Sequence, residues 1–220
     1  MIRICPSILN ADFDHLPEEI VKIASVADLL HIDVMDNLFV PNFTFDTKKV
    51  SEIIECSVLP SDLHLMIDDV DRTINPYLPT NAASITIHYE ASHNPSETLK
   101  RIRSSGKRSG LAIKPATSFD EIVGLMDHVD MILIMTVEPG FGGQSFMQET
   151  MTKVEKARKY LDQKGLTSTW LQVDGGISLE TISIARRAGA DTFVAGSAVY
   201  RSEDPAAMVE RLRELAKGAK

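Results

Sequence analysis

The sequence carries a histidine and a carboxylate at alternate positions of an apolar stretch, His31-Ile32-Asp33-Val34-Met35. His31, Asp33 and Met35 would share one face of a strand, because successive strand side chains point to opposite faces. A half-buried strand with solvated polar residues would show the same pattern. An imidazole and a carboxylate are also ligands that divalent transition metals accept, so this stretch is a candidate for part of a metal site.

Two later stretches repeat this arrangement. His64 and Met66 alternate with apolar residues, and Asp174 ends another alternating run just before a double glycine. Three predicted strands thus place a metal-capable side chain near their carboxyl ends. In a parallel barrel those ends meet at one mouth, where the catalytic groups of this fold collect. We therefore expect His31, Asp33, His64 and Asp174 to converge.

Short apolar runs alternate with longer amphipathic runs along the whole chain, which is typical of βαβ units around a parallel sheet. Strands are expected at 2–7, 28–34, 60–67, 84–88, 109–113, 131–136, 169–174 and 192–195, and helices near 14–25, 46–55, 69–78, 95–105, 118–127, 147–164, 178–188 and 204–217. This α/β pattern predicts a (β/α)8 TIM barrel formed by a single domain, residues 1–220. The competing architecture is an open doubly wound sheet, which normally has a glycine-rich turn after its first strand, whereas Cys5-Pro6-Ser7-Ile8 stands there.

Glycine-rich segments follow the last three predicted strands. They are Gly140-Phe141-Gly142-Gly143, Gly175-Gly176 and Gly196-Ser197. Backbone N–H groups in such turns can bind an anion without a lysine, and barrels of this type commonly bind phosphate after strands seven and eight. A phosphorylated ligand is therefore expected. The first segment could also be a mobile lid or merely a long connection.

Three methionines, Met35, Met66 and Met135, occupy equivalent positions on predicted strands. Such methionines are usually core residues, but beside His and Asp side chains they would give the mouth a soft apolar wall. His88 shares the inward parity of the fourth strand, and it is either a neighbour of the metal ligands or a structural histidine. The remaining histidines fall in helices or loops and are expected to face solvent: His15, His93 and His128.

Composition narrows the function further. A net charge of −8 argues against broad nucleic-acid binding, which needs a basic surface. No apolar run approaches the ~20 residues of a membrane helix, and polar residues from Asn10 onward interrupt any signal-peptide core. Cys5 and Cys56 are too few and too far apart for a disulfide framework, so we expect a reduced, cytoplasmic setting.

Together these residues resemble the ribulose-phosphate 3-epimerase family. The resemblance rests on Pro6-Ser7-Ile8-Leu9, His31-Ile32-Asp33-Val34-Met35-Asp36, Phe39-Val40-Pro41-Asn42, His64-Leu65-Met66, Met135-Thr136-Val137, Pro139-Gly140-Phe141-Gly142-Gly143-Gln144, Val173-Asp174-Gly175-Gly176 and Val194-Ala195-Gly196-Ser197. It implies a (β/α)8 barrel that interconverts D-ribulose 5-phosphate and D-xylulose 5-phosphate in the pentose phosphate pathway, and a homo-oligomer, either a dimer or a hexamer.

The resemblance also implies roles for individual residues. One divalent metal ion per chain (zinc, manganese, iron(II) or cobalt) would be held by His31, Asp33, His64 and Asp174. Asp33 and Asp174 would be the acid–base pair that moves the C3 proton through an enediolate. Substrate and phosphate contacts would come from Ser7, His64, Gly140, Phe141, Gly142, Gly143, Gly175, Gly176, Gly196 and Ser197.

Four positions depart from the family pattern. Asn37 replaces a usual Gly, Lys114 and Glu138 replace common Asn residues, and Gln172 replaces a frequent Glu. Asn tolerates positive φ, so the turn at Asn37 can survive, and Lys114 is a possible partner for Glu138. These changes leave the metal and acid–base positions intact but put fine substrate preference in question.

Three alternatives share these features. A 3-epimerase of a six-carbon ketose phosphate, such as D-allulose 6-phosphate, would use the same metal site. A decarboxylase or aldolase barrel would keep the phosphate loops but centre on a lysine, for which Lys114 is the strand-end candidate. A non-enzymatic sugar-phosphate-binding barrel would not need two acids on one metal.

Overall fold

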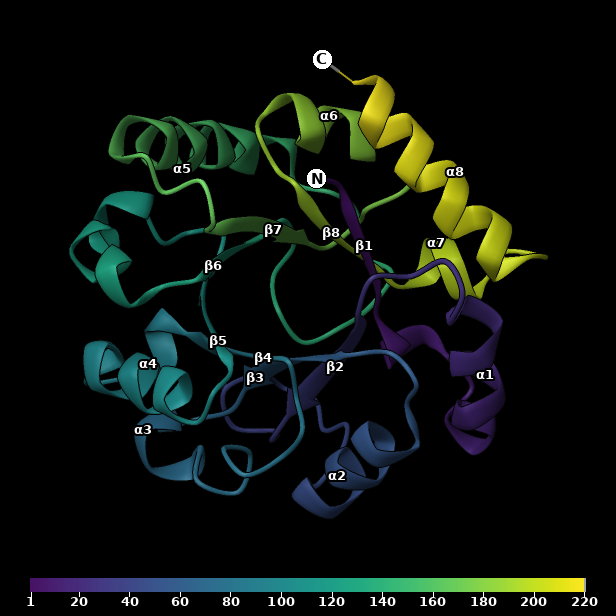
Figure 1. Cartoon of the computed structure of the whole chain (residues 1–220), viewed down its shortest axis with the longest axis horizontal. Coiled ribbons are helices and arrows are strands. Elements are labelled where there is room, and N and C mark those ends of the chain that lie inside the picture. Colours follow the sequence, from purple (N-terminus) through teal and green to yellow (C-terminus); the bar gives the residue numbers. More distant parts are fainter. Residues whose placement is uncertain (220) are drawn as a thin grey trace.

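Eight parallel strands form a ring at the centre of the protein, and helices surround it (Figure 1). The structure is a computed structural model and describes residues 1–219. The sheet order is β1-β8-β7-β6-β5-β4-β3-β2. The strands are β1 (Arg3–Pro6), β2 (Leu30–Met35), β3 (Ser61–Met66), β4 (Ser84–His88), β5 (Arg108–Ile113), β6 (Met131–Met135), β7 (Trp170–Asp174) and β8 (Thr192–Ala195). The predicted (β/α)8 barrel is confirmed.

The ring closes between its first two strands. β1 and β2 are the ends of the hydrogen-bonded order, and a parallel bridge between Ser7 and His31 joins them. Because His31 is a predicted metal ligand, the closure lies directly beside the candidate site.

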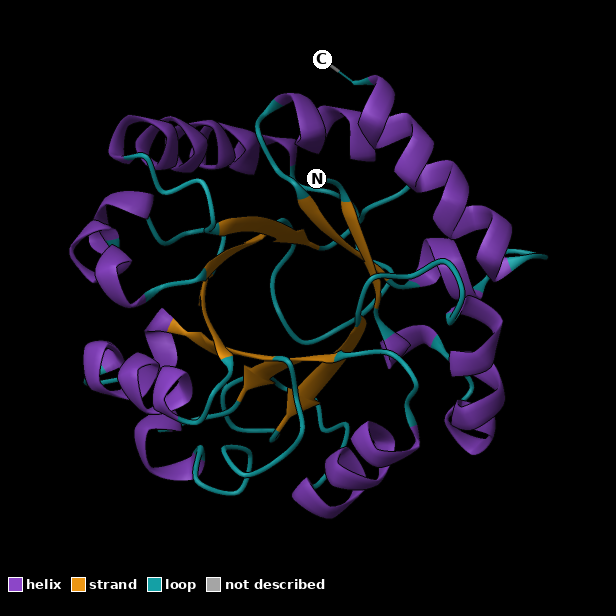
Figure 2. Cartoon of the chain, in the orientation of Figure 1, coloured by secondary structure: helices purple, strands orange, loops and turns teal. Residues whose placement is uncertain are grey.

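Helices cover the outside of the ring (Figure 2). The α-helices are α1 (Leu16–Ile23), α2 (Thr47–Cys56), α3 (Val70–Thr73), α4 (Pro95–Ser104), α5 (Met151–Lys164), α6 (Ile182–Arg187), α7 (Ser197–Tyr200) and α8 (Pro205–Gly218). The connections also contain short 3-10 helices: η1 (Ile8–Asn10), η2 (Phe13–His15), η3 (Tyr89–Ala91), η4 (Phe119–Glu121), η5 (Val123–His128) and η6 (Gln148–Thr150).

Three predicted helices are shorter or different. The helix expected at 69–78 is only α3, because Pro76 and Pro79 follow and proline disfavours helical conformation in the residue before it. The helix expected at 118–127 consists of η4 and η5, in a segment where Gly124 weakens helix formation. The helix expected near 178–188 begins only at Ile182, after a turn that Ser178 and Thr181 stabilise.

Strand parity separates two kinds of packing. On β6, Ile132 and Ile134 belong to the main hydrophobic core between the strands and the helices. Leu133 and Met135, at the alternate positions, form a separate small cluster with Ala112 and Val137. This is the expected division between the outer and luminal faces of a barrel strand.

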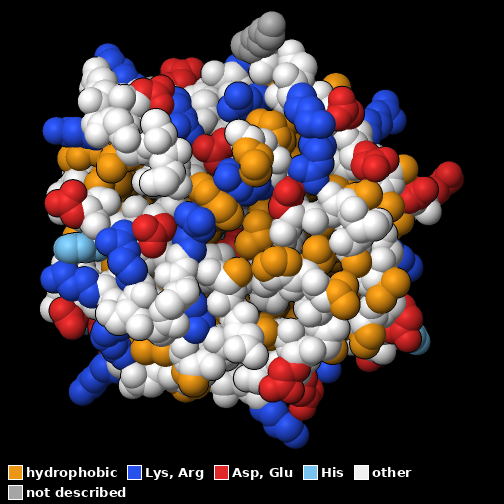
Figure 3. Space-filling view, viewed as in Figure 1, with side chains coloured by type: hydrophobic (Ala, Val, Ile, Leu, Met, Phe, Trp, Pro, Cys, Tyr) orange, Lys and Arg blue, Asp and Glu red, His pale blue; other side chains and the backbone are white. Residues whose placement is uncertain are grey.

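Acidic and basic side chains are intermixed over the face shown in Figure 3. Within residues 1–219, no helix combines the length and the apolar character needed to cross a bilayer.

Candidate active site

The four predicted metal ligands come from β2, β3 and β7 and lie together inside the barrel. His31, Asp33, His64 and Asp174 each offer one ligand atom, and these atoms lie within 4.8 Å of one another. His64 Nδ1 is 3.1 Å from Asp33 Oδ1 and 3.5 Å from Asp174 Oδ2. His31 Nε2 is 3.4 Å from Asp33 Oδ1. Chain segments more than 100 residues apart are thus brought to one point.

Strand register explains this convergence. Asp33 and His64 are Cα partners in the β2–β3 pair, so their inward side chains are direct neighbours. Asp174 is the last residue of β7 and is paired with Met135 of β6. All four side chains therefore project into the lumen: Asp174 from the end of β7, and His31 from near the start of β2, beside Ser7 just after β1.

The donor set fits a divalent metal. His31 Nε2 is buried and has no hydrogen-bond partner, although it faces two carboxylates. A lone pair directed at carboxylate oxygens is stabilised only when a cation, either a proton or a metal ion, lies between them. Two imidazole nitrogens and two carboxylate oxygens suit zinc, manganese, iron(II) or cobalt.

The electrostatics of the site favour the ionised form of Asp33. Burial raises the pKa of Asp33, but the charge of His31 and the close contacts with the His31 and His64 rings outweigh burial and hold this pKa well below its ordinary value. Burial lowers the pKa of His31 and His64, but the neighbouring carboxylates reverse this and raise both. Protons and a metal ion therefore compete for the same nitrogen lone pairs.

Asp62, which the sequence analysis missed, orients His31 through the ring nitrogen that faces away from the cluster. His31 Nδ1 is 2.9 Å from Asp62 Oδ2, and this carboxylate also accepts hydrogen bonds from Ser84 and Gln172. Burial raises the pKa of Asp62, but these hydrogen bonds outweigh it and lower the pKa. Strand alternation could have identified Asp62, because it precedes His64 by two residues and must share its inward face.

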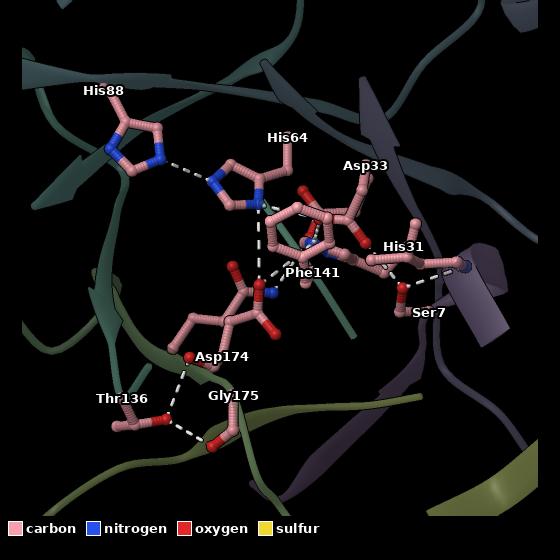
Figure 4. A network of polar contacts seen from close by, with 12 residues as sticks. Ser7, His31, Asp33, His64, His88, Thr136, Phe141, Asp174 and Gly175 are labelled. Carbon is pink, nitrogen blue, oxygen red and sulfur yellow. Dashed lines mark hydrogen bonds and ion pairs between the residues drawn. The ribbon is translucent and has the colours of Figure 1, made fainter. Parts of the chain in front are cut away.

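The ring nitrogen of His64 that faces away from the carboxylates contacts another histidine, as Figure 4 shows. His64 Nε2 is 2.9 Å from His88 Nε2, and His88 Nδ1 is 3.2 Å from Glu90 Oε2. Burial lowers the pKa of His88 to about 4. Burial raises the pKa of Glu90, but hydrogen bonds from His88, Thr117 and the Lys114 amide lower it to about 2. His88 therefore lies next to a candidate ligand, whereas Glu90 was not anticipated.

A pocket opens above this cluster at the mouth of the barrel. Met35, Met66 and Met135, the residues of the predicted apolar wall, line it and are almost fully buried. His31 and His64 are not among the residues that line the pocket, although His64 was expected to contact the substrate. The other predicted residues that line it are Ser7, Asp33, Gly140, Phe141, Gly142, Gly143, Asp174, Gly175, Gly176, Gly196 and Ser197.

The turn after β7 requires glycine at both positions. Gly176 has φ +63°, and a Cβ there would lie 2.5 Å from the backbone nitrogen of Phe146. Gly175 has φ +120°, and a Cβ there would lie 2.9 Å from the backbone nitrogen of Val137. Larger residues would push the neighbouring chain away, so glycine keeps this backbone close to the pocket.

Hydrogen bonds from side-chain amides hold the 138–144 segment in place at the pocket. Asn42 Nδ2 donates to the carbonyl of Gly140, at 2.9 Å. Gln144 Nε2 donates to the carbonyls of Glu138 and Phe141. Phe141 nevertheless remains 53% exposed. The segment is therefore a folded cover over the mouth.

Three predictions about individual residues have clear outcomes. Asn37 has φ +61°, so this non-glycine residue does adopt the left-handed turn. The possible pair between Lys114 and Glu138 is wrong, because the Lys114 ammonium lies 4.0 Å from the ring centre of Phe39 instead. Of the histidines expected to face solvent, His15 and His93 are exposed and His128 is half-buried.

Comparison with known proteins decides the family. A family model described as the ribulose-phosphate 3 epimerase family matches residues 3–200. The chain belongs to the ribulose-phosphate 3-epimerase family. It is 46% identical over 213 residues to ribulose-phosphate 3-epimerase of Mycobacterium leprae, with 97% of this chain and 94% of that protein covered. It is 42% identical over 217 residues to the Escherichia coli K12 enzyme of that name, covering 97% and 96%.

Solved structures agree on the fold. N-(5'-phosphoribosyl)anthranilate isomerase from Pyrococcus furiosus superposes with a TM-score of 0.67 at 19% identity, covering 99% of this chain and 100% of that one. At this identity the likeness concerns architecture alone. Fold, family and the convergence of the four side chains thus agree with the expectation from the sequence.

Proposed function

We propose that this enzyme epimerises a ketose phosphate at C3 and interconverts D-ribulose 5-phosphate and D-xylulose 5-phosphate. The observation that carries the proposal is the placement of Asp33 and Asp174. They come from β2 and β7, each offers an oxygen within 4.8 Å of the ligand atoms of two histidines, and both line a pocket bordered by glycine turns. The names of the curated relatives support the same substrate.

Inversion at a carbon next to a ketone requires a proton acceptor on one face and a proton donor on the other. Asp33 and Asp174 are assigned these two roles, which exchange when the reaction runs in reverse. A divalent ion held by His31, Asp33, His64 and Asp174 would supply Lewis-acid stabilisation of the negative charge that develops on the substrate oxygens. Ser7 holds Asp33 through a 2.5 Å hydrogen bond to Oδ2 and so limits its rotation.

The remaining residues are assigned to binding. Backbone N–H groups of Gly175, Gly176, Gly196 and Ser197 would hold the phosphate, because turns of this kind concentrate unpaired donors. The Gly140–Gly143 segment with Phe141 would shield the reacting carbon from bulk water. Met35, Met66 and Met135 offer neither protons nor strong dipoles, so they would line the pocket without competing for the intermediate.

Isotope exchange tests the proposal. In deuterated water, product formed from ribulose 5-phosphate should carry deuterium at C3 and none at C1 or C4. Chelator treatment should abolish activity, and zinc, manganese, iron(II) or cobalt should restore it. Asp33→Asn and Asp174→Asn should each abolish epimerisation, and metal content must be measured in both because each acid is also a proposed ligand. Product without C3 deuterium, with direct transfer between the acids excluded, would contradict the scheme.

The proposal extends to substrate size, location and assembly. Comparing ribulose 5-phosphate with allulose 6-phosphate in the same assay would distinguish five- from six-carbon specificity. We propose a cytoplasmic enzyme, in keeping with Cys5 and Cys56, which are both free thiols. A homo-oligomer, either a dimer or a hexamer, is also proposed, and light scattering on the purified protein would measure its mass.

A further inference from the structure

We propose that Glu90 and His88 form a relay that fixes the tautomer of His64, so that Nδ1 presents a lone pair to the metal site. The inference rests on the proposed function. In it, Glu90 and His88 are positioning residues that act on the ligand through a chain of hydrogen bonds. This gives His88 a role that its parity alone left open.

The assignment follows from counting hydrogens along the chain. An ionised carboxylate can only accept, so the 3.2 Å contact with Glu90 Oε2 requires the hydrogen on His88 Nδ1. A neutral His88 then has a lone pair on Nε2. The 2.9 Å contact between this atom and His64 Nε2 requires a hydrogen on His64 Nε2. A neutral His64 consequently has its lone pair on Nδ1, 3.1 Å from Asp33 Oδ1.

Two further hydrogen bonds hold the Glu90 carboxylate in the orientation that the relay requires. Its other oxygen, Oε1, accepts hydrogen bonds from the Lys114 backbone amide at 2.7 Å and from the Thr117 hydroxyl at 2.5 Å. The carboxylate therefore cannot turn away without losing both bonds. His88 and His64 are both fully buried, so water cannot supply alternative partners along the chain.

The two metal-facing histidines are thus supported in different ways. His31 meets its carboxylate, Asp62, directly at 2.9 Å. His64 meets its carboxylate, Glu90, only through His88. Partners of this kind fix ring orientation and tautomer and strengthen metal binding, and their loss typically weakens affinity about 10- to 100-fold. The relay also connects the metal site to the 114–117 loop at the end of β5.

Glu90→Gln is the decisive variant, because it should reverse every hydrogen in the chain. The Gln carbonyl oxygen must keep the position that accepts from Lys114 and Thr117, so the amide N–H would face His88 Nδ1. His88 would then carry its hydrogen on Nε2 and donate to His64. A neutral His64 would have its hydrogen on Nδ1, where the metal should bind.

Zinc affinity, measured by competition with a chelator, is the first readout. We expect Glu90→Gln to bind zinc about 10- to 100-fold more weakly than the parent. Nitrogen-15 NMR of the histidine rings gives a second readout, with the His88 hydrogen on Nδ1 in the parent and on Nε2 in the variant. Thr117→Val is the matched control, since it removes a neighbouring hydrogen bond to Glu90 without altering the tautomers, and it should bind zinc within about twofold of the parent.

A second pair of variants does not depend on the folding of Glu90→Gln. His88→Gln offers a carbonyl oxygen that can accept from His64 Nε2, whereas His88→Leu offers none, so His88→Gln should retain the higher zinc affinity. Adding Glu90→Gln to His88→Gln should cause little further loss, because the relay would already be interrupted.

The outcomes separate the relay from the metal site. Equal zinc affinity in Glu90→Gln and the parent, or equal affinity in His88→Gln and His88→Leu, would overturn the relay and leave the proposed function intact. A parent protein that binds neither zinc nor manganese would overturn the metal site itself, and the relay with it.

Discussion

The hydroxyl of Ser7 donates a 2.5 Å hydrogen bond to Oδ2 of Asp33, while Oδ1 of the same carboxylate lies 3.1 Å from His64 Nδ1. Ser7 also forms the backbone bridge to His31 that closes the barrel. One residue therefore joins two strands and sets the rotation of a proposed acid–base group. Both side chains are buried, so water cannot replace the hydroxyl freely.

Replacing Ser7 with Ala should lower kcat roughly 10- to 100-fold, because a misplaced acid–base group loses near-attack geometry. The metal content should stay unchanged, since Asp33 Oδ1 keeps its contacts with the histidines. Steady-state kinetics and metal analysis of the same preparation would measure both effects. Loss of metal in parallel with activity would show instead that Ser7 acts by holding the ligand.

Gly196→Val should raise KM for ribulose 5-phosphate at least about tenfold, because a side chain there enters the proposed phosphate pocket. A Cβ at Gly196 would lie 2.6 Å from Asn10 Oδ1, so the Asn10 amide would also be displaced. Metal content should remain that of the parent. Gly124→Ala is the control, since its Cβ meets nothing within 4 Å. An unchanged KM in Gly196→Val would remove this turn from the phosphate site.

Strand parity explains how much of the site the sequence could predict. Alternation alone put His31 and Asp33 on one face, and the rule that parallel strands end at one mouth added His64 and Asp174. The supporting residues needed more than alternation. Asp62 reaches His31 because the two residues are cross-strand partners. Glu90 reaches His88 because of the path that the chain takes after β4. Both relationships are properties of the tertiary structure.

The helices were less predictable than the strands for a related reason. An amphipathic pattern near 118–127 fits an α-helix or a 3-10 helix, and packing selects between them. The 69–78 segment shows the opposite problem, because its prolines disfavour a helix although its apolar spacing suggests one. Lys114 and Glu138 share strand ends, but Phe39 offers the ammonium a cation–π contact that sequence position could not reveal.

The stability of the segment between α3 and α4 should depend on pH through Asp71. Its carboxylate accepts four hydrogen bonds, from Ser92, Thr98 and the amides of His93 and Asn94. Burial raises the pKa of Asp71, but these hydrogen bonds lower it overall. Because the folded pKa is depressed, the stabilisation is present above the unfolded value of about 4 and is lost as pH falls through the folded value.

Asp71→Asn should therefore reduce the free energy of unfolding at pH 7 by about 1–2 kcal/mol, because its amide can satisfy the same partners only with neutral hydrogen bonds, which are weaker than those to a carboxylate. Urea unfolding with chelator present, repeated from pH 7 down to pH 3, would measure the difference from the parent. That difference should shrink below about pH 4. Asp127→Asn, on the exposed surface of η5, should change stability little at any pH. A deficit that does not vary with pH would contradict the assignment to the carboxylate charge.

The last prediction concerns Gln172, which stands where the family frequently has Glu. Gln172 Nε2 donates a 2.8 Å hydrogen bond to Asp62 Oδ2, and both side chains are fully buried. Gln172→Glu would place a second carboxyl group against Asp62, and two buried carboxylates in contact cannot both ionise without a large cost. The pair should hold one shared proton, with a pKa raised above that of the unfolded chain.

Because the pKa of the pair is raised in the folded state, the stabilisation that the shared proton gives is fully present below the unfolded pKa of about 4. It is lost as the pH rises through the folded pKa. Gln172→Glu should thus be destabilised more at pH 8 than at pH 5, by about 1–3 kcal/mol relative to the parent at the higher pH. Urea unfolding of the metal-free protein at both pH values would measure this. Gln172→Met is the control of similar size, since it removes the same hydrogen bond without adding an acid, and its deficit should differ little between the two pH values. Equal deficits at pH 5 and pH 8 in Gln172→Glu would mean that no proton is shared with Asp62.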